Sequence, residues 1–527
     1  MKNFLILPAC ILFCIHTVFS QAGSLDNSFS GDGKITLLVG DSSSTANAIA
    51  IQQDGKILVA GILYSALHKN NDFLIVRFNT DGTLDKSFAS TGARGIDFGG
   101  DDRAYSVIVQ PDGKIAVFGH SFHSHHTEYV IAARLQTNGK LDSTFGVNGE
   151  VMIPFTSYNN ELIYAAAIQA DGKFVMAGDY FTGAELSDRF ALIRLNSNGT
   201  LDNTFGTNGE VFTFASNYQA YVLSYALSVA IQPDGRIVAG GRVDTSNKSM
   251  FAIVRYKSNG TLDSAFGGDG IVNKSVGTNN AFAFGTGVAI QPDGKILQAG
   301  RAGGFAVLRY NSNGSLDKTF SGNGKAVFSA GGLTSANSIA LQTDGKIILA
   351  GTANTGNGDV ALIRVNSDGT QDNFGSFGIV TTNFGGNDVG NAVAIQADGK
   401  IVVAGSRNGN RIIVARYLAT GSPLTASVEK ITTEIKSANA DVLAQNFPNP
   451  FSNTTTINYS LPQSRIGGTS AKIIVTDKNG NALKQFSVSQ NKGSITVDAS
   501  TLSSGAYQYS LYVDGRLIAS KQMILSK

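Results

Sequence analysis

The sequence predicts an all-β protein: a seven-bladed β-propeller over residues 21–422, joined by a linker over residues 423–441 to a small β-sandwich over residues 442–527. The first reason is a phrase, Gln-x-Asp-Gly-Lys/Arg-Ile/Phe, that recurs seven times at intervals of roughly 51 to 63 residues. Repetition with this period is typical of units that stack on their neighbours to bury a shared core. The second reason is that short runs rich in Val, Ile and Phe alternate with Gly, Asn and Asp turns, and no long segment has the 3.6-residue apolar period of a helix.

The first repeat shows the four strands that we expect in each blade. Ala46 to Gln52 alternates apolar with small or polar residues, as a strand does, and Asp54-Gly55 predicts a tight hairpin turn. Lys56 to Gly61 is the second strand, Phe73 to Asn79 is the third, and a segment that ends at Phe98 is the fourth. Four antiparallel strands per repeat indicate a propeller blade, a fold that protects its sheet edges by closing into a ring.

The phase of the repeat predicts how the ring closes. The segment from Leu25 to Val39 matches a fourth strand with the phrase that precedes it, and the repeats end at Ile412 to Tyr417, which match a third strand. We therefore expect the N-terminal strand to complete the last blade.

The topology sorts the connections onto two faces. Turns after the first and third strands are nearly the same in every repeat and emerge on what we call the uniform face. Connections after the second and fourth strands differ between repeats and emerge on the variable face. Long loops are expected there at Gly61–Asp72, Gly119–Glu128, Gly178–Arg189 and Gly240–Met250, and a short one at Arg301–Gly304. Because binding surfaces usually lie on variable loops of a rigid scaffold, we expect function on the variable face.

Residues 1–20 are predicted to be a secretory signal peptide, with a basic start, an apolar core and cleavage before Gln21. Both cysteines, Cys10 and Cys14, lie within it, so the mature chain would have no thiol for a disulfide or a metal. The 41 Lys and Arg nearly balance the 39 Asp and Glu, which argues against a nucleic-acid partner. No later stretch approaches the roughly 18 apolar residues of a membrane helix, so no transmembrane segment is expected after signal removal.

The C-terminal segment resembles a known family. Asn446 to Phe451 reads NFPNPF and precedes an apolar strand, Asp477 to Gly480 forms a D-x-x-G hairpin, and Leu502 to Tyr507 reads LSSGAY. This series resembles the type A sorting domain of the type IX secretion system of Bacteroidetes. The resemblance implies that residues 442–527 engage the type IX secretion machinery, and that the protein is secreted or held on the outer-membrane surface.

The repeats resemble a second family. The phrase Gln-x-Asp-Gly-Lys-Ile, together with Arg-x-Asn and Leu-Asp-x-x-Phe, is similar to the delta-60 repeat, a propeller unit, over roughly residues 25 to 417. The seventh copy departs from the pattern with Gln371-Asp372-Asn373-Phe374. This family carries no settled activity, so the resemblance implies a scaffold and leaves the function open.

Each repeat carries one Arg in its third strand and one Asp in the Leu-Asp phrase. An active site needs one such set, whereas seven copies indicate a structural tie between the third strand and the segment before the fourth. The arginines are Arg77, Arg134, Arg194, Arg255, Arg309, Arg364 and Arg416. The aspartates are Asp26, Asp85, Asp142, Asp202, Asp263, Asp317 and Asp372.

No cofactor is required by these patterns, but two metal sites are alternatives. The histidines that do not repeat lie after second strands of adjacent blades, and with Asp101 and Asp102 nearby they could hold zinc, copper or nickel, unless they are a solvated loop. These histidines are His68, His120, His123, His125 and His126. The segment Asn79 to Asp85 and its copy Asn366 to Asp372 partly match calcium loops, although side chains that cap their own turns are the favoured interpretation.

The favoured function is a non-enzymatic scaffold that binds an extracellular protein or glycan. Tyrosine-rich segments of the variable face suit recognition. The candidates are Tyr158, Tyr180, Tyr218 and Tyr221, with Tyr164 and Tyr225 beside them. The alternative is a hydrolase or lyase that degrades an extracellular polymer with acids found once in the chain at the variable end of the channel. Those acids would come from Glu161, Asp179, Glu185 and Asp188.

Overall fold

The computed structural model describes residues 22–40, 42–123, 127–154, 159–182, 187–216, 222–245, 248–276, 283–329, 334–354, 357–375, 378–420, 443–460, 471–477, 482–488, 492–513 and 516–527. The chain divides into two compact units, Met1–Thr425 and Ala426–Lys527. No helix among the described residues has the length and apolar character needed to span a bilayer.

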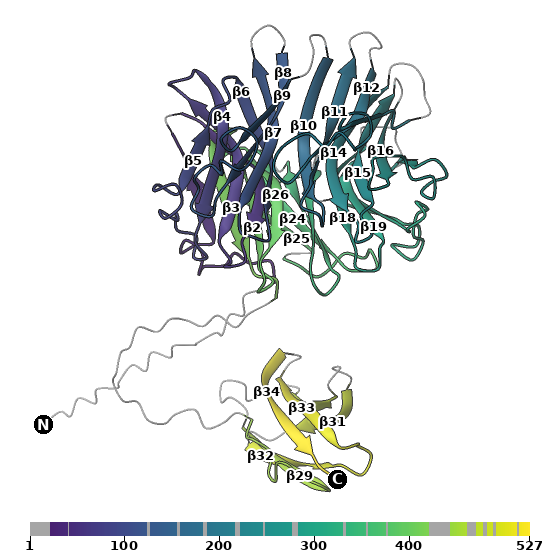
Figure 1. Cartoon of the computed structure of the whole chain (residues 1–527). Coiled ribbons are helices and arrows are strands. Elements are labelled where there is room, and N and C mark those ends of the chain that lie inside the picture. Colours follow the sequence, from purple (N-terminus) through teal and green to yellow (C-terminus); the bar gives the residue numbers. More distant parts are fainter. Residues whose placement is uncertain are drawn as a thin grey trace, which may run out of the picture. The chain divides into compact units, whose positions relative to one another are not determined.

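The first unit is a ring of seven four-stranded antiparallel sheets (Figure 1). Blade one is β2 (Ser44–Ile51), β3 (Ile57–Ser65), β4 (Asn70–Phe78) and β5 (Ala93–Ile96). Blade two is β6 (Asp101–Val109), β7 (Ile115–His123), β8 (Thr127–Leu135) and β9 (Glu150–Pro154). Blade three is β10 (Asn159–Ile168), β11 (Phe174–Thr182), β12 (Ser187–Leu195) and β13 (Glu210–Thr213). Blade four is β14 (Leu223–Ile231), β15 (Ile237–Thr245), β16 (Lys248–Tyr256) and β17 (Ile271–Lys274).

The remaining blades follow the same plan with shorter middle strands. Blade five is β18 (Phe284–Ile290), β19 (Ile296–Arg301), β20 (Phe305–Tyr310) and β21 (Lys325–Phe328). Blade six is β22 (Thr334–Leu341), β23 (Ile347–Ala353), β24 (Asp359–Val365) and β25 (Ile379–Thr382). Blade seven is β26 (Asp388–Ile395), β27 (Ile401–Arg407) and β28 (Arg411–Tyr417), and its outer strand is β1 (Lys34–Leu37).

The N-terminal strand closes the ring, as the phase of the repeat predicts. Lys34 of β1 lies opposite Ala415 of β28, and Leu37 lies opposite Ile412. Before β1, the Gly23 N–H donates to the Leu418 carbonyl at 2.8 Å. Residues from both ends of the repeat region therefore hold the last blade together.

The variable-face connections differ from the long loops that the sequence predicts. In blade one the second strand continues to Ser65 and the third begins at Asn70, so a predicted loop is largely hairpin. The reason is that Ile62, Leu63 and Tyr64 are residues with high strand propensity, and they extend the ladder. The hairpin strands have nine residues each in blades one to four, but six each in blade five. The walls of the variable face are therefore unequal in height.

The cores lie between neighbouring blades. The Phe of every Leu-Asp-x-x-Phe phrase, or of its seventh variant, is fully buried. These residues are Phe29, Phe88, Phe145, Phe205, Phe266, Phe320 and Phe374. Each blade thus contributes one large ring to its junction with the next, which explains why the phrase repeats.

The second unit is a small two-sheet structure. One sheet pairs β29 (Thr454–Ser460) with β32 (Lys492–Asp498). The other has the order β31 (Ala482–Val488), β30 (Ala471–Thr476), β33 (Gly505–Val513) and β34 (Arg516–Leu525). The described part of this sandwich has six strands.

Candidate functional site

A seven-fold clasp holds the blades together at the uniform face. In blade one, Nε of Arg77 bonds an Asp85 carboxylate oxygen at 2.8 Å, and Nη1 donates to the Thr137 carbonyl of blade two at 2.5 Å. The same guanidinium lies 4.7 Å from the centre of the Phe88 ring. All seven repeats keep this arrangement. The Arg–Asp pairs are Arg77–Asp85, Arg134–Asp142, Arg194–Asp202, Arg255–Asp263, Arg309–Asp317, Arg364–Asp372 and Arg416–Asp26.

The clasp also fixes the charge of its carboxylates. Burial alone would raise the pKa of Asp85, but hydrogen bonds from Ser87 and Lys56, with the charge of Arg77, outweigh burial and lower the pKa to about 2. The same Arg–Asp pair recurs in seven equivalent places, so these residues do not distinguish one blade from another.

The calcium-like segments are also turns that cap themselves. The Asp81 carboxylate accepts the Thr83 N–H at 2.9 Å and the Thr83 hydroxyl at 2.6 Å. Asp368 accepts the corresponding pair from Thr370 at 2.9 and 2.7 Å.

A second seven-fold feature lies on the innermost strands, next to the channel. Each of these strands has a β-bulge at the same place, seven residues before the Asp-Gly turn. The bulged residues are Asn47, Tyr105, Tyr164, Leu227, Thr286, Asn337 and Asn391. Bulges re-aim a side chain, here toward the channel.

In four blades the bulged residue ties its strand to the next blade. Asn47 donates to the Ala104 carbonyl at 2.9 Å. Thr286, Asn337 and Asn391 make equivalent bonds at 2.6, 2.9 and 2.8 Å. These bonds form a partial ring around the channel that runs from blade five through blade seven to blade one.

The ring of bonds is interrupted at blades two to four. There the bulged residues are Tyr105, Tyr164 and Leu227, whose side chains have no amide. Where the bond is present, it is made to the carbonyl of the residue that precedes the bulged residue of the next blade. The equivalent carbonyl for blade two is that of Ile163, and its partner is instead Nδ1 of His120, 3.3 Å away. One side of the channel is thus built differently from the other.

The interrupted side carries an aromatic cluster. The rings of Tyr105 and His120 are stacked with centroids 5.1 Å apart, and Tyr164 meets Tyr105 edge-on at 5.8 Å. Phe122 meets His120 edge-on at 5.0 Å, and the Arg103 guanidinium lies 5.5 Å from the Phe122 ring centre. Burial lowers the pKa of His120 to about 4, so the imidazole is neutral at physiological pH.

Two buried carboxyl groups stand beside this cluster, each hydrogen-bonded to a tyrosine. Asp179 interacts with Tyr164, and Asp188 interacts with Tyr225. Burial, followed by the nearby charge of Asp188, raises the pKa of Asp179 to about 7. The Arg242 guanidinium covers the Tyr225 ring at 4.4 Å. His120, Asp179 and Arg242 each follow the Gly of a second strand, so three adjacent blades present three different ionisable groups at one level.

The channel itself contains a hollow of about 220 Å³. Its lining comes from the inner strands of all seven blades and includes Tyr105, Tyr164 and Leu227 on the interrupted side. Two larger hollows, of about 500 and 560 Å³, lie on the uniform face between blades seven and one and between blades four and five. Their linings occupy equivalent repeat positions, for example Arg416 in one and Arg255 in the other, so these two hollows follow from the repeat.

The tyrosine candidates are only partly within the described residues. Tyr180 stacks on Phe212 with ring centroids 4.1 Å apart, in blade three. Tyr158, Tyr218 and Tyr221 lie outside the described residues, as does Glu185. Glu161 is in β10, opposite Tyr180, but its side chain is outside the description.

The histidines predicted as one cluster lie in separate settings. His123 packs against Tyr129 with centroids 4.6 Å apart, and His120 belongs to the aromatic cluster. His125 and His126 lie outside the described residues. Among the described residues, one group brings three metal-ligating side chains within 4.8 Å, and His68 is its only histidine.

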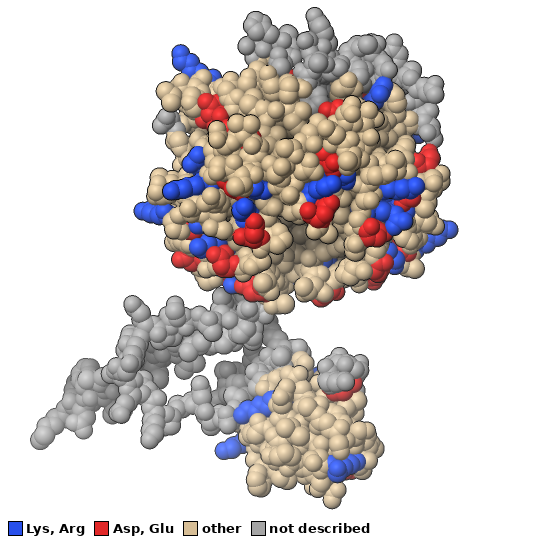
Figure 2. Space-filling view, viewed as in Figure 1, with Lys and Arg blue, Asp and Glu red and all other residues tan. Residues whose placement is uncertain are grey.

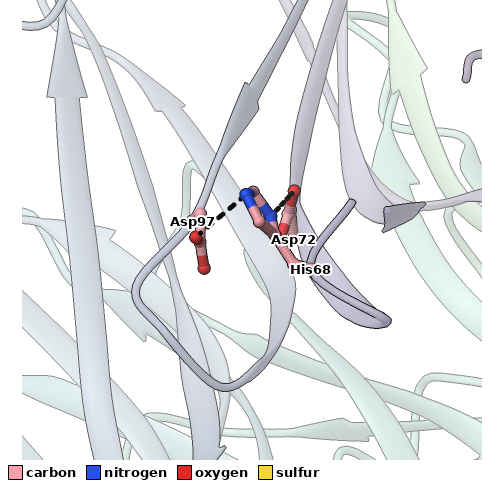
Figure 3. A group of neighbouring side chains, drawn as sticks. All are labelled: His68, Asp72 and Asp97. Carbon is pink, nitrogen blue, oxygen red and sulfur yellow. Dashed lines mark hydrogen bonds and ion pairs between the residues drawn. The ribbon is translucent and has the colours of Figure 1, made fainter. Parts of the chain in front are cut away.

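That group joins His68 to Asp72 of β4 and Asp97, which follows β5 (Figure 3). Nδ1 of His68 is 3.1 Å from the Asp72 carboxylate, and Nε2 is 3.4 Å from Asp97. The hydrogen bond to Asp72 raises the pKa of His68. Both ring nitrogens of His68 are directed at carboxylates, so the imidazole links the β3–β4 connection to the segment after β5. A metal ion would have to displace one of these contacts.

Tyr105, Arg103 and Arg242 were not predicted from the sequence. A signal was present, because the residue seven places before each Asp-Gly differs between repeats while its neighbours are similar. The meaning of that position depends on the bulge, which becomes visible only in the register of the strands.

Family models match a segment of each of the seven repeats and most of the C-terminal unit. A model described as "Domain of unknown function (DUF5122) beta-propeller" matches residues 52–88, 110–145, 169–205, 232–266, 291–320, 342–374 and 396–423. A model described as "Secretion system C-terminal sorting domain" matches residues 445–526. The chain is a seven-repeat DUF5122 propeller with a type IX sorting domain. The sorting domain implies an interaction with the type IX secretion machinery, and the DUF5122 propeller is accordingly a secreted or cell-surface protein.

Solved structures similar to the DUF5122 propeller share little sequence with it. A protein of unknown function from Dyadobacter fermentans is 12% identical with a TM-score of 0.39, over 73% of this chain and 98% of that chain. One from Bacteroides caccae is 12% identical with a TM-score of 0.33, over 62% and 98%. The β-propeller domain of the Trilobed protease from Pyrococcus furiosus is 11% identical with a TM-score of 0.35, over 76% and 98%. The comparison with curated proteins finds no match.

Proposed function

We propose that this exported propeller is a binding scaffold that holds an extracellular ligand, a glycan or a protein, at the variable-face side of the channel in blades two to four. The observation that carries the proposal is the interrupted ring of bulge bonds. In four blades the bulged side chain forms a hydrogen bond to the next blade, whereas Tyr105 and Tyr164 are not used in this way and line the channel.

The shape of the propeller supports the same location. Hairpins of nine-residue strands in blades one to four stand beside the six-residue strands of blade five. Tall walls beside a low one form a concave surface, which ligand sites favour. The charge pattern adds little selectivity, because acidic and basic side chains are interspersed on the propeller surface in Figure 2 and form no large patch of one sign.

The experiment is a screen of the protein without residues 1–20 against arrays of glycans and extracellular proteins, followed by variants of both faces. Tyr105→Ala and Tyr180→Ala should each weaken binding of the ligand found. Lys114→Ala and Lys295→Ala on the uniform face should leave it unchanged, with melting temperatures as the folding check. A ligand that responds only to the uniform-face variants would overturn the proposal.

One observation favours the alternative, an extracellular polymer-degrading hydrolase or lyase. Asp179, with its raised pKa, and Tyr164 form an acid pair beside the channel, and such pairs can transfer protons. Release of reducing ends or of unsaturated products from extracellular polysaccharides, abolished by Asp179→Asn, would support an enzyme. Binding without turnover by the wild type would support the scaffold.

A further inference from the structure

We propose that the ligand is a neutral saccharide, one unit of which enters the channel hollow and packs its C–H groups against Tyr105 and Tyr164. This inference rests on the proposed function and adds the chemical class of its ligand. It is argued from the lining of the hollow and from the groups beside it.

The lining of the hollow is polar and carries no charge. The described residues that line it include no Asp, Glu, Lys, Arg or His, although all seven inner strands contribute to it. Its volume is about 220 Å³. A charged group that entered would lose its hydration without gaining an ionic partner, so the lining favours a neutral guest.

The two sides of the hollow differ in chemistry. On one side are the rings of Tyr105 and Tyr164 with the aliphatic Leu227. On the other side, Asn337 and Asn391 each donate one amide N–H to the neighbouring blade. The Asn337 amide oxygen also accepts the Ser335 hydroxyl at 3.1 Å, and because an amide oxygen has two lone pairs it can accept one further hydrogen bond. A pyranose ring has the matching character, with apolar C–H faces and hydroxyl groups around its edge.

The residues behind the aromatic side supply hydrogen-bond acceptors. A carbonyl can only accept, so the contact with Ile163 places the proton of His120 on Nδ1 and leaves a lone pair on Nε2. Asp179 is 4% exposed, and its Oδ1 has no partner among the described residues. Both groups can accept from hydroxyls, which a saccharide supplies in number.

The nearby arginines do not favour an acidic saccharide. Arg103 forms an ion pair with Asp101 at 2.8 Å, and Arg242 forms one with Asp244 at 3.2 Å. A uronate or sulfate would have to compete with these carboxylates for Arg103 and Arg242. The carboxylates of Asp188 and Glu128 also act on Asp179, and such charges disfavour an anionic guest.

The test uses an array that carries neutral, uronate-containing, sialylated and sulfated glycans, probed with the protein without residues 1–20. We expect neutral glycans to bind. The diagnostic variant is Tyr105→Asn, which installs the residue that blades one, six and seven carry at the same bulge and should therefore fold. It should weaken binding about tenfold or more without lowering the melting temperature. Tyr105→Phe, which keeps the ring, should stay within about threefold of wild type, and the exposed Tyr64→Ala is the control.

The outcomes separate this inference from the proposed function. Preference for acidic glycans, absence of glycan binding, or neutral-glycan binding that Tyr105→Asn leaves intact would overturn the saccharide assignment. A protein ligand lost in Tyr105→Asn would overturn the saccharide while leaving the scaffold in place. A ligand of any class that responds only to Lys114→Ala or Lys295→Ala would overturn both.

Discussion

At the scale of single residues, Asp179 marks the difference between the blades most clearly. Each clasp aspartate is paired with an arginine, and the pKa of Asp202 is lowered, whereas Asp179 is buried beside Tyr164 and its pKa is raised to about 7. Burial of a carboxyl group without a cation in contact is costly, and such groups are concentrated at functional sites. The position therefore marks a candidate site, at some expense to the stability of the fold.

This residue gives a pH prediction with a definite sign. The pKa of Asp179 is raised from an ordinary 3.8 to about 7, so its contribution to stability is fully present below about pH 4 and is lost as the pH rises to about 7. Because Asn does not ionise, Asp179→Asn removes this pH-dependent loss of stability. We expect the stability of the variant relative to wild type to increase between pH 4 and pH 8, by at most about 4 kcal/mol. Urea unfolding of both proteins across this range is the measurement, with exposed Asp171→Asn as control; parallel profiles would contradict the assignment.

Residue-level prediction from sequence succeeded where repetition supplied the information. The Arg and Asp of each repeat were recognisable because seven copies exclude a single active site, and the structure shows them paired. Tyr105 was not recognisable, because its role follows from a bulge and from the contact of His120 with Ile163 across two blades. A bond between residues 43 positions apart leaves no local pattern in the sequence.

At the scale of elements, the clasp is what joins one blade to the next. Arg194 bonds Asp202 in its own blade and the Ser258 carbonyl in blade four.

The strand lengths at the variable face were not predicted correctly from the sequence, because residues such as Ile62 and Tyr64 continue the ladder where polar neighbours suggested a loop.

Removing one clasp should therefore destabilise the ring. In Arg194→Met the buried Asp202 keeps Lys173 at 2.9 Å but loses the arginine, and the bond to blade four disappears. We expect a loss of about 3–5 kcal/mol in the free energy of unfolding, measured by chemical denaturation. Lys257→Met at an exposed turn should change it by less than about 0.5 kcal/mol. A loss that small in Arg194→Met would show that the clasp does not hold the blades.

At the scale of the whole molecule, the two units are assigned different roles. The propeller carries the proposed ligand site, and the sorting domain implies export. The number of blades and the closure by β1 could be predicted because the repeat has a phase that can be counted at both ends. The ligand could not be predicted. The seven-fold pattern identifies the residues of the scaffold, but it does not indicate what the few positions that differ between repeats would bind.

The division predicts that the two units can be separated. A chain that ends at residue 421 should unfold cooperatively by circular dichroism, because the clasp, the cores and β1 are all retained. In a host with a type IX system it should remain in the periplasm, as followed by cell fractionation. Fusing residues 442–527 to an unrelated periplasmic protein should send that protein out of the cell. Secretion of the truncated chain would contradict the export role.

The account's central claim is that function lies in what the seven repeats do not share. The most direct measurement is a crystal structure of the protein with the ligand found on the arrays. We expect the ligand in the channel hollow against Tyr105 and Tyr164, on the side where the ring of bulge bonds is interrupted. A ligand seated instead in the uniform-face hollows beside Arg416 or Arg255, where every blade offers the same residues, would contradict it.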